Sequence, residues 1–198
     1  MRLVLASGNC GKLRELGQLL APLDLELIAQ DELGVEPVEE TGASFEANAL
    51  LKARHAAAAT GLPTLADDSG LEVDALGGAP GIHSARYAGG AGDAANRAQL
   101  LAALRDVPAA ARGARFRCVL ALVRAPGDPA PLLAHGAWEG RIALAERGAS
   151  GFGYDPLFEV PDLGRTAAEL EPAEKDARSH RGQALAALLL ALRAQPLA

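Results

Sequence analysis

Polar and backbone-bending residues crowd the segment 65–89, LADDSGLEVDALGGAPGIHSARYAG, in a chain otherwise rich in alanine and leucine. Its adjacent aspartates, Asp67 and Asp68, follow a hydrophobic run, and adjacent side chains of a strand point to opposite sides. One carboxylate can therefore face a crevice while the other supports a turn. Together with an acidic loop such as Glu39 and Glu40, such a carboxylate suits Mg²⁺, which prefers oxygen ligands. The histidines show no zinc-ligand spacing, and the GGAPG run by itself is typical of a structural turn.

The segment Ser7–Lys12, SGNCGK, is typical of a phosphate cradle at the junction of a strand and a helix. Glycines let backbone N–H groups approach an anion, the helix N-terminus adds a partial positive charge, and Lys12 adds a full one. The segment is neither a Walker A loop nor a dinucleotide fingerprint. The alternative is a tight turn with a surface lysine.

A further polar patch runs from Glu39 to Ala53. Glu46 and Lys52 are not spaced as a helical ion pair, whereas Asn48 and Lys52 lie four residues apart on one helix face. The alternative is a solvated loop followed by a polar stripe on a helix.

The last patch has two parts. The segment 150–156, SGFGYDP, places an aromatic pair and an acid on a flexible backbone, as a nucleobase pocket needs for stacking and edge recognition. The segment 174–182, EKDARSHRG, places four basic side chains within two helical turns, which predicts a positive face. The alternative for the second part is a solvated helix face.

The elements that position these patches follow from hydrophobic spacing. Strands are predicted at 2–7, 24–30, 63–68, 114–125 and, as one or two strands, 129–144, and helices at 12–23, 44–60, 92–107 and 171–194. Ser44 is the candidate N-cap of the second helix, and Gly61 and Pro63 end it. The alternation of strands and helices predicts an α/β fold with a mixed sheet flanked by helices. The segment from about 110 to 145 could form a smaller β-rich lobe.

Composition narrows the class of protein. With 198 residues, 49% of them hydrophobic, the chain can bury a core as a single domain spanning 1–198. A net charge of −6 argues against a nucleic acid polymer as a partner. The apolar runs near both ends are too short for a signal peptide or a membrane helix, so we expect a cytoplasmic protein with no membrane partner. Cys10 and Cys118 are expected to be reduced thiols.

Taken together, the patches describe a site for a nucleoside triphosphate with Mg²⁺. The glycine loop and the basic residues would meet phosphates, the acidic residues would hold the metal, and the aromatic segment would meet a base. All three lysines of the chain, Lys12, Lys52 and Lys175, fall in these patches.

Five segments in order, LASGNCGKLREL, EETGASFEANALLKA, ADDSGLEVDALGGAPGIHSARYAG, GFGYDPLFEV and SHRGQAL, closely resemble the inosine/xanthosine triphosphate pyrophosphatase family, also called Ham1-like. The resemblance covers residues 2 to 193. It implies a homodimer with an α/β fold of two lobes around a central cleft. It also implies hydrolysis of ITP, dITP and XTP, noncanonical purine nucleoside triphosphates, to the monophosphate and pyrophosphate, which cleanses the nucleotide pool.

The resemblance also implies roles for individual residues. Asp68 would be the proton acceptor, and Glu40 and Asp68 would be the Mg²⁺ ligands. Asp67 is assigned to the turn by the alternation of the strand alone. The residues implied to bind substrate are Ser7, Gly8, Asn9, Cys10, Gly11, Lys12, Lys52, Ser69, Phe152, Gly153, Tyr154, Asp155, Lys175, His180 and Arg181. Among these, Phe152 to Asp155, His180 and Arg181 would form the base pocket.

Two alternatives differ from this interpretation. One is a nucleotide-binding sensor without turnover, which the complete acidic set argues against. The other is a Maf-type pyrophosphatase, which has related chemistry and prefers other bases. Pyrophosphate release from a panel of nucleotides, with and without Mg²⁺, separates all three.

Overall fold

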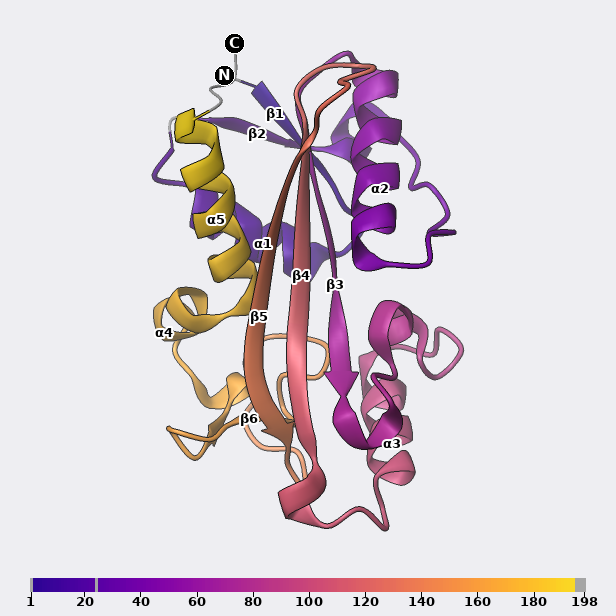
Figure 1. The fold of residues 1–198 in the computed structure, drawn as a ribbon, viewed down its shortest axis with the longest axis vertical. Helices are drawn as coiled ribbons and strands as arrows, with labels where there is room; N and C mark the ends of the chain where they lie inside the picture. The colour runs from indigo at the N-terminus through magenta and orange to yellow at the C-terminus, as the bar shows by residue number, and fades with distance from the viewer. Residues whose placement is uncertain (1, 24, 195–198) are drawn as a thin grey trace. The chain divides into compact units, whose positions relative to one another are not determined.

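In the computed structural model, which describes residues 2–23 and 25–194, seven strands form one mixed sheet in the order β2-β1-β3-β4-β5-β6-β7 (Figure 1). The strands are β1 (Arg2–Ala6), β2 (Glu26–Ala29), β3 (Thr64–Val73), β4 (Gly113–Val123), β5 (Leu132–Ile142), β6 (Phe158–Val160) and β7 (Arg165–Thr166). Strand β1 pairs in parallel with β2 and β3, whereas β6 is antiparallel to β5 and β7. The predicted α/β fold with a mixed sheet and flanking helices is confirmed.

The helices begin and end where local chemistry allows. They are α1 (Cys10–Leu20), α2 (Phe45–Thr60), α3 (Asp93–Ala103), α4 (Pro172–Arg178) and α5 (His180–Ala194). Ser44 caps α2 as predicted, because its hydroxyl accepts the Ala47 N–H at 3.2 Å. Gly61 ends α2 with a φ of 70°, a conformation that glycine adopts without strain. Short 3₁₀ helices η1 (Gln30–Leu33), η2 (Asp74–Leu76), η3 (Gly81–Arg86), η4 (Ala109–Ala111) and η5 (Ala167–Glu169) complete the set.

The single helix predicted over 171–194 is wrong, because the chain breaks at Ser179. This residue has extended backbone angles of φ −65° and ψ 154°. Its N–H still donates to the Lys175 carbonyl at 2.8 Å, so it closes α4 before α5 begins at His180. The predicted positive face does not form, since Lys175 and Arg181 lie on different helices and both are buried.

The described residues fall into two compact units. The first takes those within Met1–Asp68, Cys118–Gly136 and Arg181–Ala198, and the second takes Ser69–Arg117 and Ala137–His180. Strands β3, β4 and β5 contribute residues to both. The segment from about 110 to 145 supplies β4 and β5, and the predicted single domain with a smaller lobe there stays a prediction.

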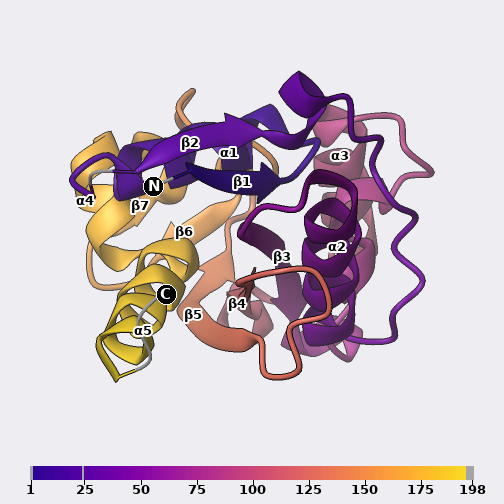
Figure 2. The same cartoon turned by 90° about the horizontal axis from the view of Figure 1, so that it is seen from above.

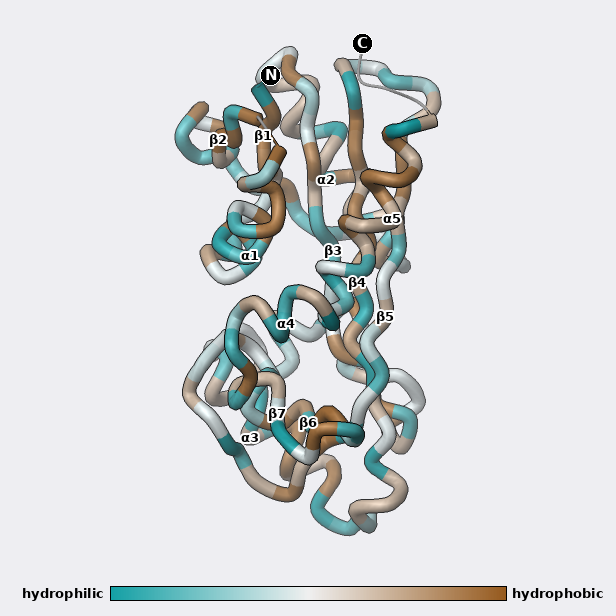
Figure 3. The backbone as a smooth tube through the Cα atoms, turned by 90° about the vertical axis from the view of Figure 1, so that its left-hand side faces the viewer, coloured by the Kyte–Doolittle hydropathy of each residue, from teal (hydrophilic) through white to brown (hydrophobic). Residues whose placement is uncertain are grey.

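In the first unit, helices cover both faces of the sheet (Figures 1 and 2). Alternate residues of the strands, such as Leu3, Leu5 and Leu120, pack with leucines of α1 and α5 in one core cluster. Four alanines of α2, Ala49, Ala53, Ala56 and Ala57, are fully buried, and α2 contacts β1. Figure 3 shows α5 largely in the hydrophobic colour, as a helix against a core requires.

The second unit has its own core, which is richer in aromatic side chains. Phe116, Trp138 and Phe158 pack together, with the Phe116 and Phe158 ring centroids 4.4 Å apart. Leu100 of α3 is buried in this cluster, and the partly buried Leu101 packs against it. Within residues 2–23 and 25–194, no helix of the molecule combines the length and the apolar character that crossing a membrane requires.

Candidate active site

Strand β3 carries the two adjacent aspartates, and their side chains make separate sets of contacts as the strand geometry predicts. Asp67 Oδ1 lies 2.7 Å from Lys12 Nζ, and Asp67 Oδ2 accepts a hydrogen bond from Arg181 Nε at 2.8 Å. The Cys118 thiol also donates to Asp67 Oδ2, at 3.2 Å. Both carboxylate oxygens are thus engaged, and the predicted role of Asp67 in a turn is wrong, because β3 continues as a strand to Val73.

The charges around Asp67 decide its ionisation. Burial alone would raise the pKa of Asp67, but the positive charges of Arg181 and Lys12 outweigh burial and hold this pKa well below its ordinary value. Arg181 also forms a buried ion pair with Glu15 of α1. This group therefore balances two carboxylates against two cations inside the first unit.

Asp68 makes a different set of contacts. Its Oδ1 accepts a hydrogen bond from Lys52 Nζ at 2.8 Å, and Glu40 Oε1 accepts from the same ammonium at 2.7 Å. The other oxygen, Asp68 Oδ2, is buried and has no hydrogen-bond partner among the described residues. Burial raises the pKa of Asp68 above its ordinary value, more than the nearby Lys52 and Lys12 lower it. One buried carboxylate oxygen is thus left unsatisfied by the described residues and retains the capacity to bind a cation or a proton.

Lys52 of α2 connects these acidic groups. Its ammonium donates to three acceptors, because the Asp67 carbonyl oxygen also lies 2.7 Å away. Burial disfavours the charged ammonium, but Asp68 and Glu40 outweigh that effect and raise the pKa of Lys52 above its usual value. Lys52 therefore stays charged at neutral pH.

A hydrogen bond connects the loop that carries Glu40 to the first turn of α2. Gly42 N–H donates to the side-chain oxygen of the fully buried Asn48 at 2.8 Å. A Cβ at Gly42 would lie 2.6 Å from that oxygen, so only glycine fits here. Asn48, which shares a helix face with Lys52, thereby holds Glu40 near the lysine that it contacts.

The predicted phosphate cradle lies between β1 and α1, where Asn9 is the N-cap. Its side-chain oxygen accepts the N–H groups of Gly11 and Lys12 at 2.9 and 3.1 Å. Ser7 Oγ accepts the N–H of Asn9 at 3.1 Å. The helix consequently begins at Cys10, two residues before the sequence pattern predicts, and its first donors point to Asn9.

The residues present fit a divalent cation held by few protein ligands. The described residues contain no cluster of three or more His, Cys, Asp or Glu side chains arranged to hold a metal. Mg²⁺, however, usually takes one or two carboxylates together with water and substrate phosphates. Asp68, with its open oxygen, and Glu40, 24% exposed in its side chain, match that pattern.

The predicted base-pocket segment lies in the second unit and is ordered around Asp155. Asp155 Oδ2 accepts the Phe152 N–H at 2.9 Å and forms a 2.7 Å contact with Lys175 Nζ. Lys175 Nζ also lies 5.3 Å from the centroid of the Phe152 ring, which is cation–π distance. A Cβ at Gly151 would collide with the Asp155 carboxylate, so glycine is required there.

His180 and Tyr154 are buried in the same unit. The His180 ring stacks on Phe116 at 4.8 Å between centroids. The Tyr154 hydroxyl donates to the Ser84 carbonyl at 2.9 Å, which ties the aromatic segment to η3.

The predicted site residues divide between the units. The first unit contains Ser7, Gly8, Asn9, Cys10, Gly11, Lys12, Glu40, Lys52, Asp68 and Arg181. The second contains Ser69, Phe152, Gly153, Tyr154, Asp155, Lys175 and His180. Arg181 was predicted with the base pocket but makes the ion pairs of the first group, so its role toward a base stays a prediction.

Sequence reasoning missed several contacts of the charged group. Glu15 looks like an ordinary polar position of α1, and its partner Arg181 is 166 residues away in the chain. Cys118 looks like a core residue of β4. It is a free thiol, as is Cys10, which agrees with the predicted reduced state. No local pattern signals either contact, since both depend on how distant segments pack.

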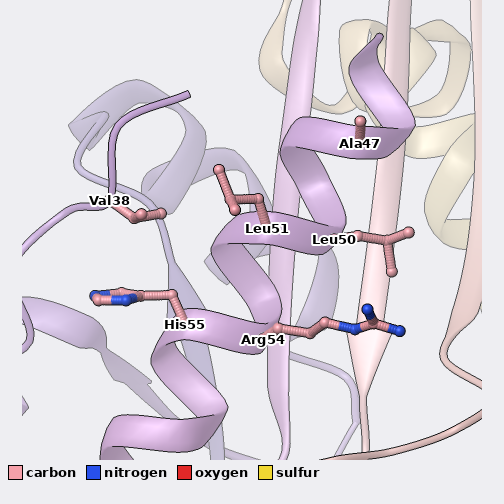
Figure 4. Close-up of a pocket in the computed structure, with 6 residues that line it drawn as sticks. All are labelled: Val38, Ala47, Leu50, Leu51, Arg54 and His55. Carbon is pink, nitrogen blue, oxygen red and sulfur yellow. The ribbon is translucent and has the colours of Figure 1, made fainter. Parts of the chain in front are cut away.

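A separate pocket of about 510 Å³ lies on the outer face of α2 in the first unit (Figure 4). It is lined by Val38, Ala47, Leu50, Leu51, Arg54 and His55. None of these is a predicted site residue, and the lining is mainly apolar. The pocket therefore carries none of the chemistry described above.

Comparisons with known proteins agree with this geometry. The model of the Ham1 family matches residues 3–191. A dITP/XTP pyrophosphatase from Yersinia pseudotuberculosis is 63% identical over 193 residues, 97% of this chain and 98% of that protein. A dITP/XTP pyrophosphatase from Thioalkalivibrio sulfidiphilus is 60% identical over 190 residues, 96% of this chain and 97% of that protein.

A solved structure gives the same result. A HAM1 protein from Coxiella burnetii superposes with a TM-score of 0.89 at 53% identity, covering 98% of this chain and 99% of that one. The family model spans nearly the whole chain, and the relatives match along nearly their whole length. From sequence, fold and site together, the chain belongs to the Ham1 family.

Proposed function

We propose that the chain hydrolyses the α–β phosphoanhydride bond of ITP, dITP and XTP and releases the monophosphate and pyrophosphate. Relatives that are 63% and 60% identical carry the name dITP/XTP pyrophosphatase. Within the molecule, the proposal rests on Asp68. Its carboxylate is buried, has one oxygen on Lys52 and leaves the other without a hydrogen-bond partner among the described residues.

Glu40 and Asp68 would hold Mg²⁺. Their oxygens suit a hard cation, and both contact the same lysine. When bound, Mg²⁺ neutralises negative charge on the phosphates and so supports attack at phosphorus. Isothermal titration calorimetry with Mg²⁺ in the absence of nucleotide would show whether the two carboxylates bind the ion without the substrate.

Asp68 is the proposed proton acceptor. The carboxylate would take the proton of the water that attacks the α-phosphorus on the oxygen that does not hold Mg²⁺, while the hydrogen bond from Lys52 to Oδ1 keeps the carboxylate oriented. The pKa of Asp68 is raised by burial, which makes this carboxylate a stronger base than an exposed one.

The phosphates need positive charge and N–H donors. Lys12 and Lys52 would supply the charge and the backbone of the Ser7–Gly11 loop the donors, with Ser69 and Lys175 as further contacts. The N–H groups of Asn9 and Gly11 would then exchange their present acceptors, Ser7 Oγ and Asn9 Oδ1, for phosphate oxygens. Because Lys12 is ion-paired with Asp67, the triphosphate would compete with that carboxylate for the ammonium.

The base would lie against the Phe152–Asp155 segment, with His180 and Arg181 as predicted neighbours. Hypoxanthine and xanthine carry an oxygen acceptor at position 6, where adenine carries an amino donor. Donors in the pocket would therefore be satisfied by ITP and left unpaired by ATP.

The proposal includes a homodimer that acts in the cytoplasm, as the family resemblance implies. Analytical ultracentrifugation of the full chain tests the first part, since a sedimenting monomer at micromolar concentration would contradict it.

The decisive experiment measures pyrophosphate release from ITP, dITP, XTP, GTP and ATP, with Mg²⁺ and with a chelator. The expected result is Mg²⁺-dependent release from the first three and little from ATP. Binding without release would instead support a nucleotide sensor. Release mainly from other nucleotides would support a Maf-type preference, and either outcome overturns the proposal.

A further inference from the structure

The segment 150–156 is proposed above to meet the base. Side chains of helix α3, to which the sequence analysis assigned no function, form hydrogen bonds with this segment. Helix α3 begins at Asp93, and three of its polar residues, Asp93, Asn96 and Arg97, fall within its first five positions. Residues three and four apart share one helix face, so these side chains act on the same neighbours.

Asp93 and Arg97 both form hydrogen bonds with the backbone of a single glycine, Gly153. The Gly153 N–H donates to Asp93 Oδ2 at 2.7 Å, and Arg97 Nη1 donates to the Gly153 carbonyl at 2.9 Å. Two side chains one helical turn apart thus hold both backbone polar groups of one residue. Gly153 has a φ of 59°, so the backbone around it is an irregular turn that regular secondary structure does not hold.

Arg97 is itself fixed in place. Its Nε lies 3.0 Å from Glu146 Oε1, an ion pair in which the direction of the N–H gives no hydrogen bond. The Arg97 side chain is 16% exposed, so its guanidinium is largely shielded from water. An arginine held at one nitrogen and donating from another has little freedom to release Gly153.

The third polar residue, Asn96, extends the same arrangement to η3. Its side chain accepts the Ala88 N–H at 2.7 Å and donates to the Ala85 carbonyl at 3.1 Å. Since the Tyr154 hydroxyl donates to the Ser84 carbonyl, the segments around Gly153 and around η3 are both tied to α3 and to each other. All these contacts lie within the second unit.

The hydrogen bonds to Gly153 also fix the positions of its neighbours in the chain. Phe152 precedes it, and Asp155, which contacts Lys175, follows two residues later. A shift of the Gly153 peptide would move the Phe152 ring relative to Lys175, and binding is sensitive to displacements of about 1 Å.

We propose that Asp93 and Arg97 are positioning residues that set the geometry of the base-binding segment and thereby the affinity and base preference of the site. This inference rests on the proposed function, in which the Phe152–Asp155 segment meets the purine. Both residues bind the backbone of Gly153 and neither is among the residues proposed to meet the phosphates, so their loss should act on substrate binding before it acts on the chemical step.

The test compares four variants with matched controls. Asp93→Ala and Arg97→Ala should each raise KM for ITP about tenfold, the loss expected for one hydrogen bond to a charged group, with a much smaller change in kcat. Asp93→Asn should keep nearly the wild-type KM, because the amide oxygen still accepts the Gly153 N–H. Arg97→Lys should fall between. Asp106→Ala and Arg105→Ala remove exposed charges just after α3 and should change nothing.

Two further readouts separate positioning from general stability. Hydrogen exchange at residues 152–154 should quicken in the two alanine variants and stay slow in Asp93→Asn. The ratio of kcat/KM for ITP to that for GTP should fall in the alanine variants alone. Thermal unfolding identifies any variant that simply fails to fold, and Asp93→Asn and Arg97→Lys then carry the comparison.

The outcomes distinguish this inference from the proposed function. Folded alanine variants with unchanged KM and unchanged ITP preference would overturn the inference while wild-type hydrolysis upheld the function. If wild type binds ITP without hydrolysing it, calorimetric affinities of the same variants decide the inference alone. If wild type neither binds nor hydrolyses ITP, both are wrong.

Discussion

The two faces of strand β3 carry neighbouring carboxylates in opposite states. Asp67 has both oxygens paired, with Lys12, Arg181 and the Cys118 thiol around it, and its pKa is lowered. Asp68 has one oxygen paired and the other open, and its pKa is raised. A fully paired buried carboxylate holds surrounding elements together. An incompletely paired one retains the capacity to bind a cation or a proton.

The largest expected effect comes from substituting Asp68, the incompletely paired carboxylate. Asp68→Asn keeps an acceptor for Lys52 but removes the proton acceptor, so kcat for ITP should fall by roughly 10²–10⁴. The folded state should lose little stability, because Glu40 still pairs Lys52. Pyrophosphate release and chemical denaturation measure the two quantities. Turnover close to wild type would show that Asp68 is not the proton acceptor, and the proposed difference in role between Asp67 and Asp68 would then be wrong.

Substituting Asp67, the fully paired carboxylate, should lower the free energy of unfolding. Asp67→Asn leaves the buried Arg181 and the partly buried Lys12 without their shared carboxylate, and breaking a buried pair such as Asp67–Arg181 costs about 3–5 kcal/mol in the free energy of unfolding. Urea denaturation without added metal measures the loss. Asp68→Asn is the matched control, since it changes the next residue by the same chemistry.

The pH dependence of that loss follows from the lowered pKa of Asp67. A carboxylate whose pKa is depressed by folding stabilises the protein above its unfolded pKa of about 3.9, and this stabilisation disappears as the pH falls further. The stability difference between wild type and Asp67→Asn should therefore stay constant from neutral pH down to about 5 and shrink below about 4. A difference that grew on acidification would show that the ion pairs do not stabilise the fold.

The smallest effect concerns the thiol on the paired face. Burial, together with the Asp67 carboxylate, raises the pKa of the Cys118 thiol well above its usual value, whereas Cys10 is exposed. Iodoacetamide at neutral pH should therefore modify Cys10 alone in the folded protein and both cysteines after unfolding. Peptide mass spectrometry locates the adducts, and rapid labelling of Cys118 in the folded chain would contradict the closed arrangement around Asp67.

Local signals predicted much of the fold. Ser44 and Gly61 bound α2 because a hydroxyl cap and a positive φ are properties of single residues and their immediate neighbours. The opposite contact sets of Asp67 and Asp68 followed from the twofold alternation of a strand. Ser179 escaped prediction, since a helix that breaks at a residue other than glycine or proline leaves little trace in hydrophobic spacing.

The candidate site was predictable only where motifs are contiguous. The groups around Ser7–Lys12, Asp68 and Phe152–Asp155 stand out as runs of unusual residue types. Asp93 and Arg97 do not, because an acid and a base four residues apart on a helix suggest an ordinary ion pair. Their partner is the backbone of Gly153, and backbone groups leave no signature in a sequence.

The sequence alone determined which residue types were present, the α/β alternation and the family resemblance, all of which depend on order along the chain. The tertiary structure alone decided which charges meet. It brought Glu15 to Arg181 across 166 positions, gave Asp67 two cations and left one oxygen of Asp68 open. The reason is physical: the energy of a charge depends on its distance from other charges and from water, and only folding sets those distances.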